Sequence, residues 1–132
     1  MNDMTSVKIA KKGERIDYGE EIKRAKTSLE IGSIVSFLGI VRSEGGRVKR
    51  VEQGEKKVKR TLEEIAEEAV EKFGVERVGI IQRVGEMPAG GDILFITVSS
   101  RHREEGFEAC EWIMGATKEK VHRGMIEKED KQ

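Results

Sequence analysis

Hydrophobic and polar positions alternate along the chain in a way that predicts several short strands. Residues 31–42 are rich in isoleucine and valine, and residues 75–84 show a similar pattern, so each segment is expected to form a strand. Residues 93–98 are a nearly continuous apolar run, as expected of a strand that is buried on both faces. Shorter patterns near residues 7–9 and 48–51 predict two further strands.

Helical spacing of apolar residues appears in three places. Residues 57–73 predict an amphipathic helix that ends at Gly74. Residues 103–121 predict a second long helix, whose first turn carries acidic side chains that favour the helix dipole. A short helix is expected to follow a capping residue at Asp17. Its apolar face consists of Ile22, Ala25 and Leu29.

The order of these elements predicts the fold class. Because strands and helices are interleaved, we expect an α/β or α+β fold with one mixed sheet and two long helices. The chain has 132 residues, which suits a single domain over residues 1–132. The charged residues 127–132 are expected to form a frayed tail.

Composition narrows the class of function. The 25 Lys and Arg balance 25 Asp and Glu, which disfavours a basic nucleic-acid binder, and an aromatic content of 5% offers little for base stacking. No segment approaches the ~20 apolar residues of a membrane span, and residues 1–12 lack the apolar run of a signal peptide, so a cytoplasmic protein is expected. One cysteine excludes an intrachain disulfide framework, and His102 and His122 are too far apart to predict a metal site. No cofactor is predicted.

Basic residues gather in two places. Residues 42–60 contain eight basic and three acidic side chains, which fits either a solvated helix face or a loop for an anionic ligand. Arg101, His102 and Arg103 follow directly after the apolar run. The carboxyl end of a strand at the start of a helix is a common anion site, because free N–H groups and the helix dipole converge there. A basic surface turn explains this triplet equally well.

Lys118 lies on the apolar stripe of the second long helix. Met114 is seven residues after Phe107 and Lys118 is four residues after Met114, so all three fall within about 20° of one line along the helix. A lysine in this position either snorkels to solvent or points into a pocket, where partial desolvation would make it a usable nucleophile or acid/base. Cys110, near the same stripe, is interpreted as a small core residue.

Five segments occur in an order that resembles a known family. They are Phe37–Arg42, Arg83–Glu86, Val98–Arg103, Phe107–Ala109 and Ile113–Lys118. Together they resemble the F-x-G-x-V-R, R-[IV]-G-E, S-x-H-R-x-x-[AG]-F-E-A and I-M-x-x-x-K elements of the large, catalytic subunit of molybdopterin synthase. The resemblance covers most of residues 31–118.

This resemblance implies an α/β hammerhead fold and an enzyme, a sulfurtransferase of molybdenum cofactor biosynthesis. It implies a homodimer within a heterotetramer, whose two small ubiquitin-like sulfur-carrier subunits end in Gly-Gly and carry a thiocarboxylate. The reaction that it implies inserts two sulfurs into cyclic pyranopterin monophosphate and gives the dithiolene of molybdopterin.

The same resemblance implies the site residues. Those expected to bind the phosphorylated pterin are Arg42, His102, Arg103, Phe37 and Met114. Lys118 matches the first of two catalytic lysines. Met125 stands where the family has the second, and a three-residue insertion aligns Lys128 with it instead, without the flanking Pro and Trp of the family. This departure leaves an alternative open, a non-catalytic relative that binds a ubiquitin-like tail or an anionic ligand.

Overall fold

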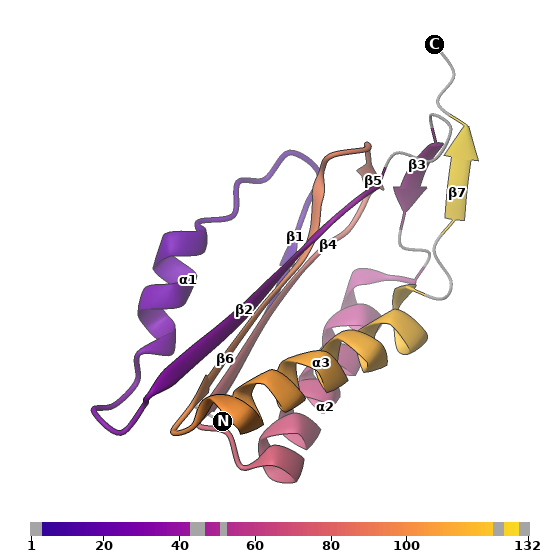
Figure 1. Cartoon of the computed structure of the whole chain (residues 1–132). Coiled ribbons are helices and arrows are strands. Elements are labelled where there is room, and N and C mark those ends of the chain that lie inside the picture. Colours follow the sequence, from indigo (N-terminus) through magenta and orange to yellow (C-terminus); the bar gives the residue numbers. More distant parts are fainter. Residues whose placement is uncertain (1–3, 43–46, 51–52, 123–125, 130–132) are drawn as a thin grey trace.

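The centre of the fold is a four-stranded mixed sheet with the strand order β1-β4-β6-β2 (Figure 1). A computed structural model describes residues 4–42, 47–50, 53–122 and 126–129 of the chain. The four strands are β1 (Thr5–Ala10), β2 (Ser33–Ile40), β4 (Arg77–Arg83) and β6 (Asp92–Ser100). β1 is parallel to β4 and the other two pairings are antiparallel, which confirms the predicted mixed sheet.

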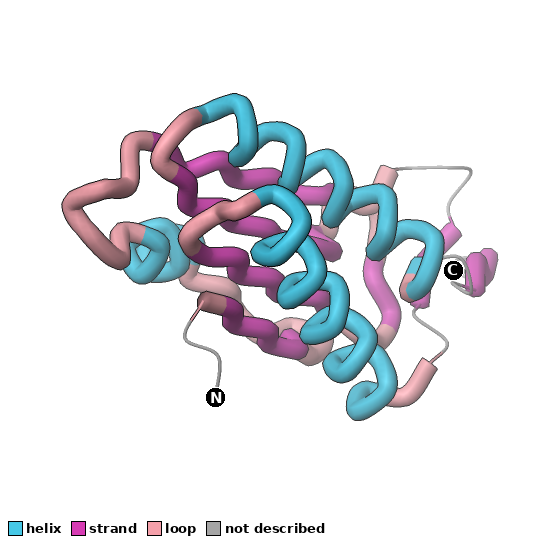
Figure 2. Tube along the Cα trace, turned by 90° about the horizontal axis from the view of Figure 1, so that it is seen from below, coloured by secondary structure: helices cyan, strands magenta, loops and turns pink. Residues whose placement is uncertain are grey.

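Helices cover both faces of this sheet (Figures 1 and 2). The two long helices, α2 (Glu55–Phe73) and α3 (Arg103–Lys120), pack side by side on one face, with α2 over β1 and β4 and α3 over β2 and β6. The short helix α1 (Tyr18–Ala25) lies on the other face. α2 ends at Gly74, whose φ of 66° is a left-handed conformation that glycine adopts without strain. Both predicted long helices are thus confirmed.

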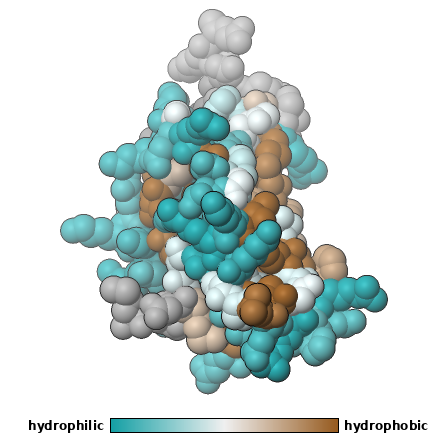
Figure 3. Space-filling model, turned by 90° about the vertical axis from the view of Figure 1, so that its left-hand side faces the viewer, coloured by the Kyte–Doolittle hydropathy of each residue, from teal (hydrophilic) through white to brown (hydrophobic). Residues whose placement is uncertain are grey.

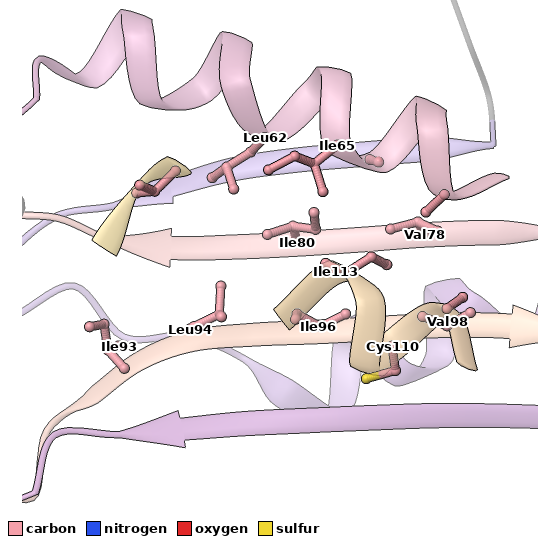
Figure 4. Close-up of a cluster of buried hydrophobic side chains, with 14 of the residues drawn as sticks. Leu62, Ile65, Val78, Ile80, Ile93, Leu94, Ile96, Val98, Cys110 and Ile113 are labelled. Atoms are coloured by element: carbon pink, nitrogen blue, oxygen red, sulfur yellow. The ribbon is translucent and has the colours of Figure 1, made fainter. Parts of the chain in front are cut away.

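The main core lies between the sheet and the two long helices. Ile80 of β4 and Ile96 of β6 cluster there with Leu62 of α2 and Ile113 of α3 (Figure 4). Strand residues of the opposite parity, such as Phe95, are buried on the α1 side. The centre of the sheet is therefore covered on both faces, which explains why the run 93–98 is apolar at nearly every position.

The first helix is shorter than the sequence predicts. Asp17 caps α1 as expected, because its Oδ1 accepts a hydrogen bond from the backbone N–H of Glu20 at 3.0 Å. The helix ends at Ala25, where the N–H of Thr27 donates to the carbonyl of Ala25 and turns the chain toward β2. Leu29 is fully exposed in this turn, so its predicted place on the apolar helix face is wrong.

A second, three-stranded sheet was not predicted. It has the order β5-β3-β7 and consists of β5 (Glu86–Met87), β3 (Arg47–Arg50) and β7 (Ile126–Glu129). The prediction of a frayed tail does not hold for residues 127–129, because they pair with β3 and bring Glu127 opposite Lys49 and Glu129 opposite Arg47. The sequence alone shows only a charged end, because the partner strand of this segment lies about 80 residues earlier in the chain. Val51 and residues 130–132 lie outside the described residues.

The face of the molecule seen in Figure 3 is mostly hydrophilic and carries a few apolar patches. Among the residues whose side chains are described, the large apolar ones that are exposed are Met4, Ile22, Leu29, Leu38, Ile40 and Phe107. Within the described ranges, no helix combines the length and the apolar character needed to cross a bilayer.

Candidate functional site

A groove opens where β2 ends beside the C-terminal part of α3. It encloses about 960 Å³ and is lined by segments that are far apart in the sequence. They are Phe37–Arg42 from β2 and the residues after it, Ile93 and Leu94 from β6, Met114, Gly115, Lys118 and Glu119 from α3, and His122. Four predicted site residues, Phe37, Arg42, Met114 and Lys118, therefore meet in one place.

The chain topology explains why these segments meet. β2 and β6 are antiparallel, so the end of β2 lies beside the start of β6. α3 follows β6 and runs back across the sheet, which brings its last turns to the end of the sheet where β2 ends and β6 begins (Figure 1). The Val41 N–H donates to the Gly91 carbonyl at 2.8 Å, and the Gly90 N–H donates to the Val41 carbonyl at 2.7 Å. These bonds fix the backbone that carries Arg42.

The groove has an apolar floor and a charged rim. Leu94 is buried and Phe37 and Met114 are half-buried, whereas Arg42, Lys118 and Glu119 are exposed. Two cations above apolar side chains can bind an anion that also has an apolar or aromatic part. Lys118 is exposed, as expected of a lysine that snorkels to solvent, and it also lines the groove.

His102 and Arg103 lie at the opposite end of α3. His102 is the N-cap of the helix, and its backbone N–H donates to Glu105 Oε1 at 2.8 Å. At a rise of 1.5 Å per residue, the 16 residues from His102 to Lys118 span about 24 Å. Within one chain, the structure therefore does not bring the His102 corner into the groove.

The neighbouring arginines at this corner already have acidic partners. Arg101 Nη2 lies 2.6 Å from Glu30 Oε2, and Arg101 Nε lies 3.6 Å from Glu76 Oε1. Arg103 Nε lies 3.6 Å from Glu104 Oε1 and is largely exposed. The Arg103–Glu104 pair is exposed and therefore weak, so an anionic ligand can compete for Arg103, whereas Arg101 bridges two acidic residues from other segments.

Lys128 lies on β7, opposite Val48 of β3. The position of its side chain lies outside the described part of the structure, so its predicted role as the second lysine stays a prediction.

Cys110 is buried in the main core, which confirms its interpretation as a core residue. Burial raises the pKa of its thiol to about 11, because the charged thiolate is poorly solvated there. The thiol is therefore protonated near neutral pH and is not a nucleophile.

Several groove residues were not predicted as site residues, among them Gly115, Glu119 and His122. His122 follows Lys118 by four residues, but α3 ends at Lys120, so helical spacing does not place the two side chains on one helix face. The turn after the helix brings His122 to the groove. No signal in the sequence identifies Gly115 either. A Cβ built on Gly115 meets no described atom within 4 Å, so a side chain there would extend into open space at the groove.

Gly115→Ala is expected to stabilise the protein and weaken ligand binding at the same time. Alanine is better than glycine inside a helix by roughly 0.8–1 kcal/mol, so the unfolding midpoint should rise by a few degrees. The added methyl group narrows the groove and should raise the KM for the ligand that binds there. Gly19→Ala in α1, which is outside the groove, is the control and should change only stability. An unchanged KM in Gly115→Ala would show that the ligand does not approach this wall.

Comparisons with known proteins identify the family. The model of the family described as MoaE protein matches residues 12–120. The molybdopterin synthase catalytic subunit of Pyrococcus abyssi is 35% identical over 121 residues, which cover 89% of this chain and 81% of that protein. The solved structure of molybdopterin cofactor biosynthesis protein E from Burkholderia multivorans has a TM-score of 0.78 at 26% identity and covers 87% of this chain and 77% of its own. Molybdopterin synthase from Staphylococcus aureus has a TM-score of 0.76 at 26% identity, over 98% of this chain and 91% of its own. This chain therefore belongs to the MoaE protein family.

Proposed function

We propose that this chain is the catalytic subunit of a molybdopterin synthase, which transfers sulfur from a thiocarboxylated ubiquitin-like small subunit to cyclic pyranopterin monophosphate. The observation that carries the proposal is the groove, where Arg42 and Lys118 stand above an apolar floor. Membership of the MoaE family supports the same reaction and the class of sulfurtransferase.

The groove offers a suitable group to each part of this substrate. The guanidinium of Arg42 binds a phosphate through charge-assisted hydrogen bonds. The half-buried side chains of Phe37 and Met114 give a flat pterin ring an apolar surface. When the thiocarboxylate sulfur bonds to a carbon of the pterin precursor, the oxygen on that carbon leaves with the bonding electrons, and the ammonium of Lys118 stabilises the negative charge on it. Water then cleaves the acyl–sulfur bond, which leaves the sulfur on the product and a carboxylate on the small subunit.

A homodimer would bring the His102 corner to this site. β2 is the last strand of its sheet, and among the described residues no strand pairs with its outer edge. Leu38 and Ile40 on β2 and Phe107 on α3 are exposed apolar side chains that a second copy could cover. A two-fold axis perpendicular to α3 on this side would set the two α3 helices antiparallel, so that the His102 end of one copy would lie toward the groove of the other.

The small subunit is the partner that supplies sulfur. A solved structure from Helicobacter pylori with the same fold, at a TM-score of 0.68 and 18% identity, is a complex of subunits 1 and 2 of molybdopterin-converting factor. We infer an equivalent complex for this chain, in which the Gly-Gly tail of the small subunit reaches the groove. A cytoplasmic location, where this cofactor chemistry would take place, stays a prediction.

Reconstitution tests the proposal directly. The purified chain, a thiocarboxylated small subunit and cyclic pyranopterin monophosphate are mixed, and dithiolene formation is measured. We expect a product that carries two sulfurs, and none when the small subunit ends in an ordinary carboxylate. Binding of the small subunit without any product would instead support the alternative of a non-catalytic relative.

A further inference from the structure

A hydrogen bond from His122 to a buried glutamine lies at the wall of the groove. His122 Nε2 is 2.7 Å from Oε1 of Gln82, and His122 lines the groove together with Arg42 and Lys118. Gln82 is on β4 and is completely buried, on the same face of the strand as Ile80. A polar side chain in this position is unusual, because burying an amide is unfavourable unless its hydrogen bonds are satisfied.

The other hydrogen bonds of Gln82 fix the orientation of its amide. Gln82 Nε2 donates to the carbonyl of Arg83 at 2.9 Å and to the carbonyl of Ile93 at 3.2 Å. Both amide protons are thereby used, and a flipped amide would turn its oxygen toward two carbonyl oxygens. Oε1 must therefore face His122, and it can only accept. His122 Nε2 consequently carries a proton whether the ring is neutral or charged.

We propose that His122 is a further substrate-binding residue of the groove and that Gln82 is the positioning residue that holds its ring. The inference rests on the proposed function, since it assigns the anion to the phosphorylated pterin. Protonation of the second ring nitrogen adds a third positive charge to the rim without breaking the bond to Gln82. The charged groups that line the groove beside His122 are Arg42, Lys118 and Glu119.

This role differs from simple support of the helix end. If His122 only satisfied Gln82, any side chain that donates to Oε1 would replace it without loss of activity. If His122 binds the anion as an imidazolium, a neutral donor restores the fold but not the affinity. Glutamine is the suitable replacement, because its amide nitrogen can reach a position close to that of Nε2.

Nitrogen NMR of the imidazole rings tests the arrangement independently of turnover. His102 and His122 are the only two histidines, and His102→Gln assigns their signals. We expect His122 to show the Nε2–H tautomer when neutral, and cyclic pyranopterin monophosphate to shift its titration to higher pH. The tautomer protonated only at Nδ1, or a titration that the pterin does not move, would overturn the proposal even if the protein proved to have no synthase activity.

Kinetics of two variants separate binding from structural support. His122→Gln should unfold at the wild-type midpoint, raise KM for the pterin about tenfold, and leave kcat nearly unchanged. Its KM should also depend less on pH than the wild-type KM, which should rise between about pH 6 and 8 as the imidazolium loses its proton. His122→Ala should have the same raised KM for the pterin as His122→Gln. Its unfolding midpoint should be lower than that of the wild type, because Oε1 of Gln82 loses its donor. A wild-type KM and pH profile in His122→Gln would contradict the assignment.

Discussion

Lys118→Ala is expected to reduce dithiolene formation by about 10²–10³-fold, the loss that follows removal of one preorganised group that stabilises charge in a transition state. Lys118 lines the groove near the end of α3, together with Arg42. The alanine variant should still fold, because the Lys118 side chain is exposed and does not belong to the hydrophobic core. The loss is measured as the rate of dithiolene formation at a saturating concentration of the small subunit.

Two further variants make the Lys118 experiment specific. Lys120→Ala removes an exposed lysine of the same helix that does not line the groove, so activity should stay close to wild type. Lys118→Arg keeps the positive charge but places it on a planar guanidinium group at a different distance from the helix. We expect this variant to restore only part of the activity. Full activity in Lys118→Ala would remove this residue from the reaction and leave Lys128 as the predicted catalytic lysine.

Mixing two inactive variants should restore activity if the site spans two copies of the chain. In a dimer of one Lys118→Ala copy and one Arg103→Ala copy, one site carries both changes and the other carries neither. Complete exchange of subunits makes about half of the dimers mixed, so about a quarter of the wild-type activity should return. The structure leads to this expectation because about 22 Å of helix separate Arg103 and Lys118 within one chain.

The matched control for this experiment uses two residues of the same groove. Arg42 and Lys118 line one groove within one chain, so mixed dimers of Arg42→Ala and Lys118→Ala contain one damaged residue in each site. No activity should return. Equal results for the two mixtures would contradict a site shared between copies. A chain that stays monomeric throughout would exclude the homodimer itself.

Much of the fold could be predicted because its signals are local. The helical period over 57–73 and the unbroken apolar run over 93–98 each reflect burial of one element, and both are confirmed by α2 and β6. The family and its enzyme class were predicted from the order of five short segments, and the comparisons confirm them. Leu29 and residues 127–129 were predicted wrongly, because a turn hydrogen bond and a distant strand decide their conformations.

The candidate site also contains some residues that could be predicted from the sequence and others that could not. Arg42 and Lys118 could be named from the sequence because each belongs to a recognisable segment, and the structure brings them to one groove. Gln82 looks like an isolated polar residue in an apolar strand, and nothing in its neighbours reveals that it holds His122, which lies 40 residues away. Hydrogen bonds of this kind depend on which strand faces which helix end.

The sequence by itself thus determined the type and order of the main elements, the family, and the chemical groups available for binding an anion. Only the tertiary structure decided which of those groups meet. The antiparallel return of α3 over the sheet brings Lys118 to the end of β2, and the rigidity of the same helix keeps His102 and Arg103 at its other end. A period of 3.6 residues indicates which face a side chain takes, whereas the position of each helix end is fixed by the packing of the whole layer.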